Sequence, residues 1–577
     1  MKIKYLEIQG FRNFKNAKFN FNKHTAIMGF NDIGKTNLMY ALRLLLDKNI
    51  SEADLELSES DFFAYENTSE IIITIKFDEV TESFVIAKLR EKISSNSELY
   101  LRYEITKCNS EYKLYIGSSI ETLEKIESRY YLRAFNLKYV TSTRNFHSFI
   151  TKEKKHLLEK AKESRTPEEK TTDSGIITSV ETSLDGLNSK VRNISYIKNA
   201  TNTINEELNK LSYKNKNQKL AFEFAGDDIN TLLNKLDLSM SKDDKLLSIG
   251  GDGKLNQIFL ALWTNKYNSD LTDLNEVSFY CIEEPEAHLH PHQQRKLSNY
   301  LANKLNNQVI ITTHSPQIIS EFEPNSIIKF YQEDDATYGA NDGCSNKLEN
   351  VFLEFAHRLD LISTEAFYSS IVILVEGQSE ILFYKALAKA LNIDLDRLNI
   401  SILMVSGVGF STYITILEHL NIPWIVRTDN DIFKVPHIDN TYRYAGIQRG
   451  INIYKEYINH NLDSKYMIDL ENIKRFTKPA APEIIKSACS LIEFLKQHNI
   501  FISKTDLESD LVNSSIKDKL ISFYNETDNE KILELMRERK GENMFKFLCN
   551  HKDDLSVLDN EDISKPLKIA KEIIESL

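Results

Sequence analysis

Two glutamates mark the stretch SSIVILVEGQSEILFYKAL, which covers residues 369–387. Its apolar run of five residues, Ile371 to Val375, predicts a buried strand that stops at Glu376, and Glu380 follows four residues later in a predicted helix. A carboxylate at the end of a buried strand loses hydration energy unless something compensates its charge. A metal ion, a lysine or a ring of backbone N–H groups would each provide that compensation.

Two more predicted strands downstream end in residues that suit a metal site. One strand is followed by Gly407 and Gly409, and the strand in IPWIVRTDND ends in a D-x-D pair. In a parallel sheet the carboxyl ends of the strands lie side by side, so their acids should converge. The expected ligands are Glu376, Glu380, Asp429 and Asp431. Oxygen ligands at this density predict Mg²⁺ or Mn²⁺ rather than zinc. The alternative is an ordinary solvated strand end with loop acids.

A second candidate site lies near the start of the chain, where GFNDIGKT at residues 29–36 fits the pattern G-x-x-x-x-G-K-[ST] at every fixed position. The segment lies between a predicted strand and a predicted helix, as phosphate binding by backbone N–H groups and a helix N-terminus requires. We predict an ATP site, with Lys35 on the β- and γ-phosphates and Thr36 on Mg²⁺. The alternative is a chance glycine turn. The expected nucleotide-binding residues are Gly29, Asn31, Asp32, Gly34, Lys35, Thr36 and Asn37.

Three later segments supply further parts of an ATPase site. VSFYCIEEP ends a predicted strand in Glu283, expected to support Mg²⁺, and Glu284, expected to polarise the attacking water. The predicted strand in QVIITTHSP ends in His314, a predicted γ-phosphate sensor. LSIGGDGKLNQ places Gly251 and Gly253 before a predicted helix, where they would bind a second face of a phosphate. We interpret the neighbouring histidines as turn and helix-start residues rather than zinc ligands: His288, His290 and His292.

The elements that must position these residues indicate an α/β protein. Two short strands and a third precede the helix from Lys35 to Asp47, and β-type runs fill residues 70–117. A charged helical stretch, interrupted at SRTPEEKTTDSG, separates them from the strands near 277 and 308, and a new βα alternation begins at 371. We expect an ATPase domain in two parts, a helical dimerisation insertion between them, and a second βα domain with a helical C-terminal region. The boundaries are 1–150, 151–215, 216–345 and 346–577.

Composition excludes several classes of protein. The sequence contains no run of about 18 apolar residues, so it predicts no membrane span. Its first residues alternate between apolar and polar as in a strand and lack the apolar core of a signal peptide. The five cysteines are scattered without a C-x-x-C pair, which indicates reduced thiols in a cytoplasmic protein. The net charge of −12 excludes a global nucleic-acid footprint, so any contact with DNA requires a local basic face.

The motifs resemble those of two known groups. The order of the ATPase segments, with FRNF at residues 11–14, resembles the heads of ABC/SMC/RecF ATPases, although LSGGQ is not clean and only Asp61 is available in place of a glutamine loop. E-x-x-x-E, glycine and D-x-D resemble a Toprim domain. An SMC-like ATPase head followed by a Toprim βαβ domain is similar to the OLD-family nucleases, and length and motif spacing fit best the nuclease subunits of Gabija anti-phage systems.

The resemblance implies a metal-dependent endonuclease that hydrolyses phosphodiester bonds in double-stranded DNA. It implies a further acid, for which Glu508 is the first choice and Asp506 the second, and a catalytic lysine, matched by Lys540. The alternative for these three residues is a solvated charged face. The resemblance also implies a homodimer or a higher oligomer such as a tetramer, and a UvrD-like helicase partner. A topoisomerase would need a tyrosine nucleophile, and we recognise no additional DNA-cleavage domain.

Two other functions compete with the nuclease. A RecF-like DNA-binding ATPase with a structural Toprim domain would act in repair, but it would not need all the aligned carboxylates. A toxin–antitoxin or signalling ATPase that senses phage would have a different nucleic acid as its target.

Overall fold

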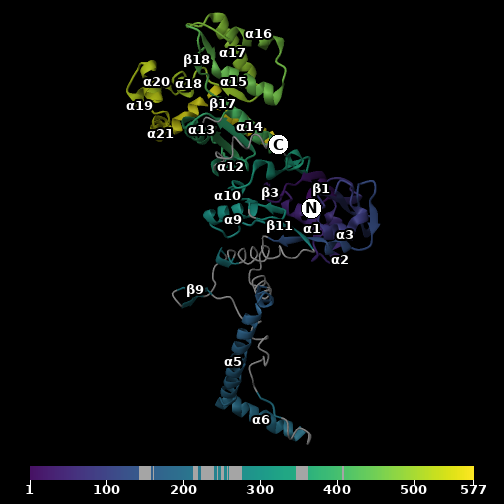
Figure 1. The fold of residues 1–577 in the computed structure, drawn as a ribbon. Coiled ribbons are helices and arrows are strands. Elements are labelled where there is room, and N and C mark those ends of the chain that lie inside the picture. The colour runs from purple at the N-terminus through teal and green to yellow at the C-terminus, as the bar shows by residue number, and fades with distance from the viewer. Residues whose placement is uncertain are drawn as a thin grey trace. The chain divides into compact units, whose positions relative to one another are not determined.

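The computed structural model, shown in Figure 1, divides the chain into two compact units. The larger unit consists of Met1–Ser142, Asn275–Glu286 and Pro291–Leu577, and the smaller unit consists of Thr143–Leu274 and Ala287–His290. None of the described helices combines the length and apolar composition that crossing a bilayer needs. The structure describes residues 1–141, 157–159, 161–211, 219–221, 240–242, 245–247, 253–255, 258, 276–303, 305–345, 361–405 and 409–576.

The larger unit begins with an antiparallel sheet in the order β2-β1-β4-β5-β6-β7. Its strands alternate between buried and more accessible residues, so one face packs on the core while the other meets solvent. The three strands read from residues 70–117 are all present. The bounds are β1 (Lys2–Phe11), β2 (Phe14–Asn20), β4 (Glu70–Asp78), β5 (Leu99–Thr106), β6 (Asn109–Gly117) and β7 (Glu124–Ile126).

A second six-stranded sheet carries the nucleotide motifs, in the order β14-β13-β3-β12-β11-β8. All neighbouring strands are parallel except β13 and β14. The strand before the phosphate-binding loop is therefore central, flanked by β12 and β13. The bounds are β3 (His24–Met28), β8 (Phe135–Val140), β11 (Val277–Glu283), β12 (Val309–Thr312), β13 (Ile327–Glu333) and β14 (Ala336–Gly339).

The helix after the phosphate-binding loop is α1, which begins at Lys35 and ends at Leu46. Its buried face includes Leu38, Leu42 and Leu45, which pack in one hydrophobic core with residues of both sheets. This burial fixes the helix N-terminus below the loop. The other helices of this part are α2 (Glu52–Leu55), α3 (Ser83–Leu89), α9 (Pro291–Asn303) and α10 (Pro316–Ile319).

A four-stranded parallel sheet, in the order β16-β15-β17-β20, forms the centre of the C-terminal part. The sequence indicated its first three strands, but it did not single out β20, a short apolar IFI segment in the otherwise helical tail. The buried run Ile371–Val375 is β15, and Glu376 follows it directly. The bounds are β15 (Ile371–Val375), β16 (Ile400–Met404), β17 (Trp424–Thr428) and β20 (Ile500–Ile502).

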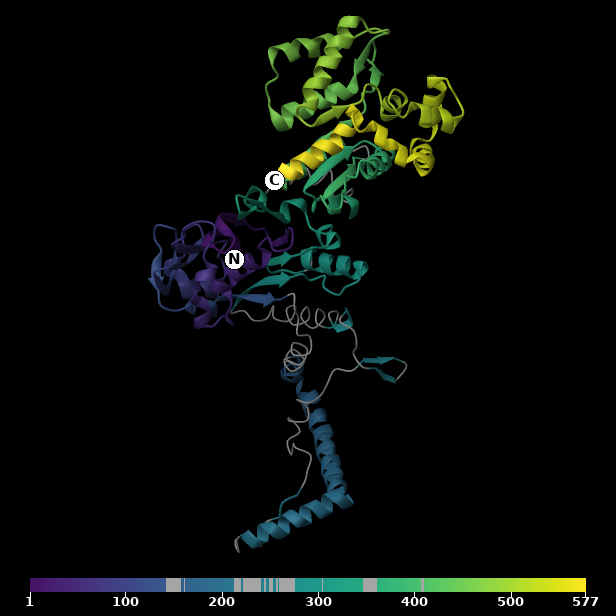
Figure 2. The same cartoon turned by 180° about the vertical axis from the view of Figure 1, so that it is seen from behind.

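Helices surround this sheet, and one short hairpin extends from it. The C-terminal helix α22 contacts β15 and β17 (Figure 2), and β18 and β19 form an antiparallel ribbon. The strands are β18 (Ile432–Lys434) and β19 (Tyr442–Tyr444). The helices are α12 (Leu361–Ala366), α13 (Gln378–Ala390), α14 (Phe410–His419), α15 (Ala445–Ile453), α16 (Ser464–Ile473), α17 (Pro482–Lys496), α18 (Leu507–Val512), α19 (Lys517–Tyr524), α20 (Asn529–Glu538), α21 (Lys540–His551) and α22 (Lys565–Ser576).

The smaller unit contains two long helices, and the first of them begins earlier than the sequence indicated. The sequence indicated an interruption over residues 164–175, whereas α5 already begins at Pro167. The reason is a capping box: Thr166 Oγ1 accepts from the Glu169 N–H at 3.2 Å, and the Glu169 carboxylate accepts from the Thr166 N–H at 2.8 Å. The described elements are α5 (Pro167–Arg192), α6 (Ser195–Leu211), β9 (Met240–Lys242) and β10 (Lys245–Leu247).

One buried lysine in the second sheet makes a prediction about stability. Lys329 on β13 is 5% exposed and donates to the carbonyl oxygen of Ser369 at 2.9 Å, and burial lowers its pKa to about 7. The unfolded chain, with its ordinary lysine pKa, keeps this proton up to about pH 10, so the free energy of unfolding should rise between pH 7 and 10. Lys329→Met removes the buried charge. At pH 6.5 the substitution should raise the free energy of unfolding by on the order of 1–3 kcal/mol and the melting temperature by several degrees. At pH 9.5 both increases should be clearly smaller.

The exposed Lys23 provides the control, because Lys23→Met should change the melting temperature little at either pH. Equal effects of the Lys329 substitution at both pH values would contradict the assignment of a buried, readily deprotonated lysine.

Candidate functional site

The phosphate-binding loop is held in shape by the segment FRNF. Gly34, just before α1, has a φ of 99°, and a Cβ there would lie 1.9 Å from Asn13 Nδ2, so only glycine fits. Asn13 donates to the carbonyl oxygen of Ile33 at 2.9 Å and accepts from Asn37 at 2.6 Å. Asn37 thus supports the loop as well as lining the cavity beside it.

Asp61 stands behind the loop, where it orients an arginine. Arg12 Nε donates to Asp61 Oδ1 at 2.9 Å, and the Arg12 guanidinium also donates to Asn37 at 2.9 Å. The carboxylate therefore acts on the nucleotide site through Arg12 and Asn37.

Lys35 is positioned to exchange backbone partners for phosphate. Its Nζ donates to the carbonyl oxygens of Gly29 at 3.0 Å and Phe30 at 2.6 Å, inside the loop. Burial lowers the pKa of Lys35 to about 8, although Glu284 and Asp32 act in the opposite direction. A negatively charged phosphate would favour the protonated form and offer stronger, charge-assisted hydrogen bonds.

The loop opens into a cavity of about 280 Å³. Its walls bring together the loop, the end of β11 and the end of β12, as the sequence predicted. Of the two adjacent glutamates, Glu284 lines the cavity, whereas Glu283 is 5% exposed at the end of β11. The lining residues are Asn31, Asp32, Gly34, Lys35, Thr36, Asn37, Glu284, Thr312 and His314.

His314 faces Glu284 across this cavity, at 3.9 Å between Nε2 and Oε1. Its backbone N–H donates to Glu286 at 2.8 Å, and Thr313 Oγ1 donates to the same carboxylate at 2.8 Å. Burial, and then Lys35, lowers the pKa of His314, so the neutral imidazole is favoured. Of the two signature-loop glycines, Gly251 lies outside the described residues, whereas Gly253 is described, in the smaller unit.

The second site is built at the carboxyl ends of β15, β17 and β20. Glu376 follows β15, and its Oε1 accepts from the Asp429 N–H at 3.0 Å, so the two strand ends are joined directly. Thr428 Oγ1 and the guanidinium of Arg449 also donate to this oxygen. The compensation that the sequence demanded for Glu376 therefore comes from an N–H group, a hydroxyl and an arginine in this structure.

The pKa of Asp429 is shifted strongly by its surroundings. It is 7% exposed, and Ser503, the residue after β20, donates to its Oδ1 at 3.2 Å. Burial raises the pKa of Asp429 to about 7, with Glu380 and Glu376 adding repulsion while Arg427 and Lys540 oppose the shift. A carboxylate in this environment gains from any cation that enters the site.

Glu380 and Glu508 complete the buried acids. Glu380, in the first turn of α13, is 5% exposed and accepts from Ser379 Oγ at 3.1 Å. Glu508, in the first turn of α18, is 1% exposed; its Oε1 has no hydrogen-bond donor within the described residues, whereas its Oε2 lies beside Lys540. Its pKa is raised, mainly by burial. Asp431 is less buried, and its backbone carbonyl accepts from the Ala445 N–H at 2.8 Å.

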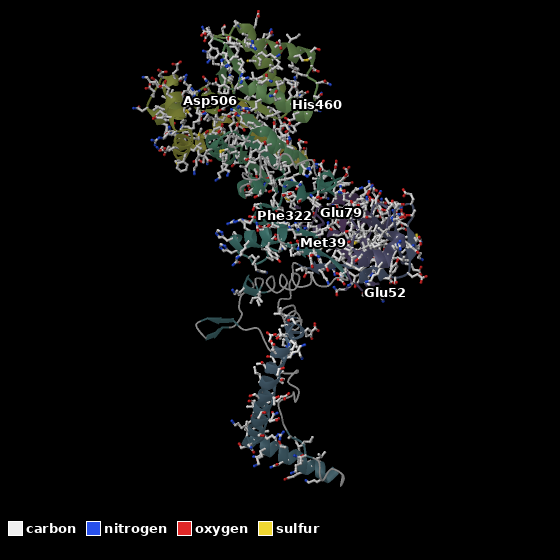
Figure 3. The ribbon with its side chains drawn as sticks, viewed as in Figure 1. Met39, Glu52, Glu79, Phe322, His460 and Asp506 are labelled. Carbon is white, nitrogen blue, oxygen red and sulfur yellow. The ribbon has the colours of Figure 1, made fainter. Side chains whose placement is uncertain are left out.

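The two remaining predicted residues differ in their surroundings. Lys540 Nζ lies 3.1 Å from Glu508 Oε2 and 3.8 Å from Asp429 Oδ2, so it joins two of the buried acids. Asp506 instead caps α18 and forms a paired contact with Arg537, with its two oxygens at 2.7 and 2.9 Å from the guanidinium (Figure 3 labels Asp506). Burial would raise its pKa, but these hydrogen bonds outweigh burial and lower it. Gly407 lies outside the described residues.

The donor set of this carboxylate centre, which we define as Glu376, Glu380, Asp429, Asp431 and Glu508, fits a hard divalent cation. Only oxygen donors are present, and Oε1 of the buried Glu508 carboxylate has no hydrogen-bond donor in the part of the chain that the structure describes. Within the described residues, no three His, Cys, Asp or Glu side chains are yet close enough to hold a metal together. Arg449 pairs with Glu376, and Lys540 lies beside Asp429 and Glu508. These two cations therefore offset part of the negative charge that a metal would neutralise.

Models of known families match the two parts of the chain that contain these sites. The family model described as "AAA ATPase domain" matches residues 1–319, more than half of the chain. The model described as "Overcoming lysogenization defect protein-like, TOPRIM domain" matches residues 367–431, which include four acids of the carboxylate centre. The chain belongs to the OLD family. The predicted α/β fold, an ATPase head with a P-loop followed by a Toprim domain, is confirmed.

Known relatives of this OLD-family chain cover most of its length. "Endonuclease GajA" from Bacillus cereus strain VD045 is 26% identical over 100% of both chains. "OLD nuclease" from Thermus scotoductus is 24% identical over 75% of this chain and 83% of its own. Among solved structures, the C-terminal region of the Burkholderia pseudomallei OLD protein matches 36% of this chain and 99% of its own length, at 19% identity and a TM-score of 0.23.

Sequence reasoning missed the residues of the OLD-family chain that support its acids. Gly446 allows α15 to approach the D-x-D loop, because a Cβ there would lie 2.2 Å from the Asp429 carbonyl oxygen. This approach brings Arg449, one turn later, to Glu376 and Thr428. Glycine and arginine in a predicted helix carry no motif, whereas the short IFI run before Ser503 was a usable signal of a fourth strand end.

Arg449 generates a prediction about the OLD-family Toprim site without its metal. Arg449→Gln removes the cation beside Glu376 but keeps a hydrogen-bonding side chain, so the crowded carboxylates should repel one another more strongly. In EDTA the variant should melt below wild type, and saturating Mg²⁺ should raise its melting temperature by more than it raises that of wild type. Thermal melts with and without Mg²⁺ measure both shifts.

Arg443→Gln is the matched control, because Arg443 is exposed and has the same charge. The counter-ion role of Arg449 is wrong if the Arg449 and Arg443 variants respond to Mg²⁺ alike.

Proposed function

We propose that this protein is a divalent-metal-dependent DNA endonuclease whose ATPase domain binds nucleotide and regulates cleavage. The observation that carries the proposal is the convergence of Glu376 and Asp429 at two parallel strand ends, with Lys540 close to both Asp429 and Glu508 of α18. The relatives named endonuclease and OLD nuclease support the same reaction and DNA as the substrate.

The acids of the carboxylate centre would hold Mg²⁺ or Mn²⁺, with the Asp429 N–H donating to the Glu376 carboxylate at the middle of the site. When bound, such ions supply an activated water for in-line attack on a phosphodiester and neutralise the leaving oxygen. Lys540 would stabilise the negative charge that develops on the phosphate oxygens. Ser503 and Thr428 would keep Asp429 and Glu376 oriented.

The nucleotide site would bind ATP with Mg²⁺. Lys35 and the N–H groups of the loop would hold the phosphates, Thr36 and Glu283 would hold Mg²⁺, and Glu284 and His314 would face the γ-phosphate from across the cavity. Action in anti-phage defence and cooperation with a UvrD-like helicase rest on the OLD-family resemblance alone.

A RecF-like repair ATPase with a structural Toprim domain is the alternative. A purely structural domain would have no use for a carboxylate whose pKa is raised to about 7, as that of Asp429 is by burial, Glu380 and Glu376. Such an acid lowers the stability of the metal-free protein at neutral pH, so its presence favours the metal-dependent reaction.

Substitution of the acids should separate cleavage from stability. Glu376→Ala and Asp429→Ala should each abolish Mg²⁺-dependent nicking of a supercoiled plasmid, because each removes an expected metal ligand. The isosteric Asp429→Asn should melt at or above wild type in EDTA at pH 8, because it removes a repelled, buried charge. Glu572→Ala, which alters an exposed acid of α22, should cleave like wild type.

Cleavage at the wild-type rate by either alanine variant would exclude the carboxylate centre as the active site. A salt-bridge role for Asp429 would instead make Asp429→Asn unstable, by about 3–5 kcal/mol in the absence of metal.

We also propose that the chain self-associates as a homodimer or a tetramer. Three apolar side chains of α5 are exposed although they recur at helical spacing, Ile176 by 57%, Val180 by 42% and Leu187 by 45%. A second copy is the partner that an apolar helix face of this kind suits best. Multi-angle light scattering at micromolar concentration should give at least twice the mass of one chain. Replacing the three residues by serine should lower that mass, and a wild-type monomer would contradict the proposal.

A further inference from the structure

The β18–β19 ribbon is joined directly to the carboxylate centre. Ile432, the first residue of β18, follows Asp431, and the ribbon ends at Tyr444, just before α15. The Ala445 N–H donates to the Asp431 carbonyl oxygen at 2.8 Å and closes the base of the ribbon. The ribbon is therefore adjacent to the acids and could contact a substrate bound there.

The two faces of the ribbon have different surroundings. On the inner face Tyr444 stacks on Phe476, with ring centroids 4.6 Å apart, and Tyr442 exchanges backbone hydrogen bonds with Phe476 at 2.7 and 2.9 Å. Phe433 pairs with Arg443 across the ribbon, and both point to the opposite face because side chains alternate along a strand. Phe433 is 50% exposed, an unusual position for a large apolar side chain beside a polar site.

Exposed cations are concentrated on this ribbon and on the neighbouring segment 474–478. Lys434 pairs with Asp439, and Lys474 pairs with Glu471. For the other three cations the described part of the chain offers no carboxylate partner, and one of them lies over the ring of Tyr442, 4.7 Å from its centroid. These three are Arg443, Arg475 and Lys478. In a chain of net charge −12 this local excess of positive charge requires an explanation.

We propose that this basic ribbon, defined as residues 432–444 with 474–478, binds the DNA duplex next to the phosphate that is cut. The inference rests on the proposed nuclease function and names the surface that holds its substrate. The segment 474–478 pairs with β19 through the backbone hydrogen bonds of Tyr442 and Phe476, so its cations and those of the ribbon form one basic surface that suits the phosphates of a duplex. The three cations without carboxylate partners contact phosphates, and Phe433 makes an apolar contact with the sugars or base edges. The direct connection of the ribbon to the carboxylate centre, whose proposed substrate is DNA, favours DNA over an acidic surface of a second copy.

Binding of a fluorescent duplex of about 30 base pairs, measured by anisotropy with full-length protein in EDTA, tests the ribbon without cleavage. The triple variant Arg443→Ala, Arg475→Ala, Lys478→Ala should bind at least tenfold more weakly at about 100 mM salt. Its slope of log K against log salt should be shallower by about 2.7, about 0.9 for each lost phosphate contact. The control Lys107→Ala, Lys113→Ala, Lys125→Ala removes the same charge from exposed positions of the head and should bind like wild type.

Phe433→Ser gives a second, independent readout. It should weaken binding several-fold without changing the salt slope, because it removes an apolar contact and no charge. All variants change exposed side chains, and unchanged circular dichroism should confirm that they fold.

The proposal is overturned if the triple variant keeps the affinity or the salt slope of the control, or if wild-type protein does not bind the duplex at 50 mM salt. If the triple variant binds DNA like wild type but has a lower mass than wild type in light scattering, the ribbon forms a contact between copies instead. Plasmid cleavage in Mg²⁺ is scored separately, so a wild-type protein that binds but does not cut contradicts the nuclease and leaves the ribbon's role in DNA binding supported.

Discussion

Repulsion among crowded carboxylates governs how the C-terminal part is built at its strand ends. Glu376, Glu380 and Asp429 meet where strands end, and the pKa of Asp429 is raised to about 7 by burial, Glu380 and Glu376. Acids in such positions lower the stability of a protein unless cations approach them. Arg449 and Lys540 approach from α15 and from the start of α21, and each contacts at least one of the acids.

The fold explains how the cations reach the acids. Parallel strands place Glu376 and Asp429 at one edge, and the hydrogen bond from the Asp429 N–H to the Glu376 carboxylate fixes their spacing. Gly446 lets α15 pack closely on the D-x-D loop and so delivers Arg449. The ATPase head uses the same means at its phosphate-binding loop, where Gly34 admits the side chain of Asn13 and the cation of Lys35 rests on backbone carbonyl oxygens. In both sites a glycine lets another part of the chain come close. In both, a cationic side chain also lies where a charged ligand would bind, phosphate beside Lys35 and a metal ion beside Arg449.

The sequence alone predicted the parts of these sites that follow from strand ends and fixed motifs. GFNDIGKT, Glu284 and His314 meet in one cavity, and Glu376 is joined to Asp429, because apolar runs and glycine turns are local signals. Residues placed by tertiary packing escaped prediction. Arg449 lies 73 positions from Glu376 in the chain, and nothing in the helix that carries it indicates its partner. Asp506 and Glu508 could not be separated by spacing, and only Arg537, from another helix, distinguishes them by pairing with Asp506.

We propose that a divalent cation replaces Arg449 as the partner of Glu376. A crystal structure of the full-length protein soaked in Mn²⁺, with anomalous scattering recorded at the manganese edge, tests it directly. We expect an anomalous peak within about 2.0–2.4 Å of carboxylate oxygens of Glu376 and Asp429, and an Arg449 guanidinium that has moved off Glu376. Manganese bound only elsewhere, with the contact between Arg449 and Glu376 intact, would contradict it.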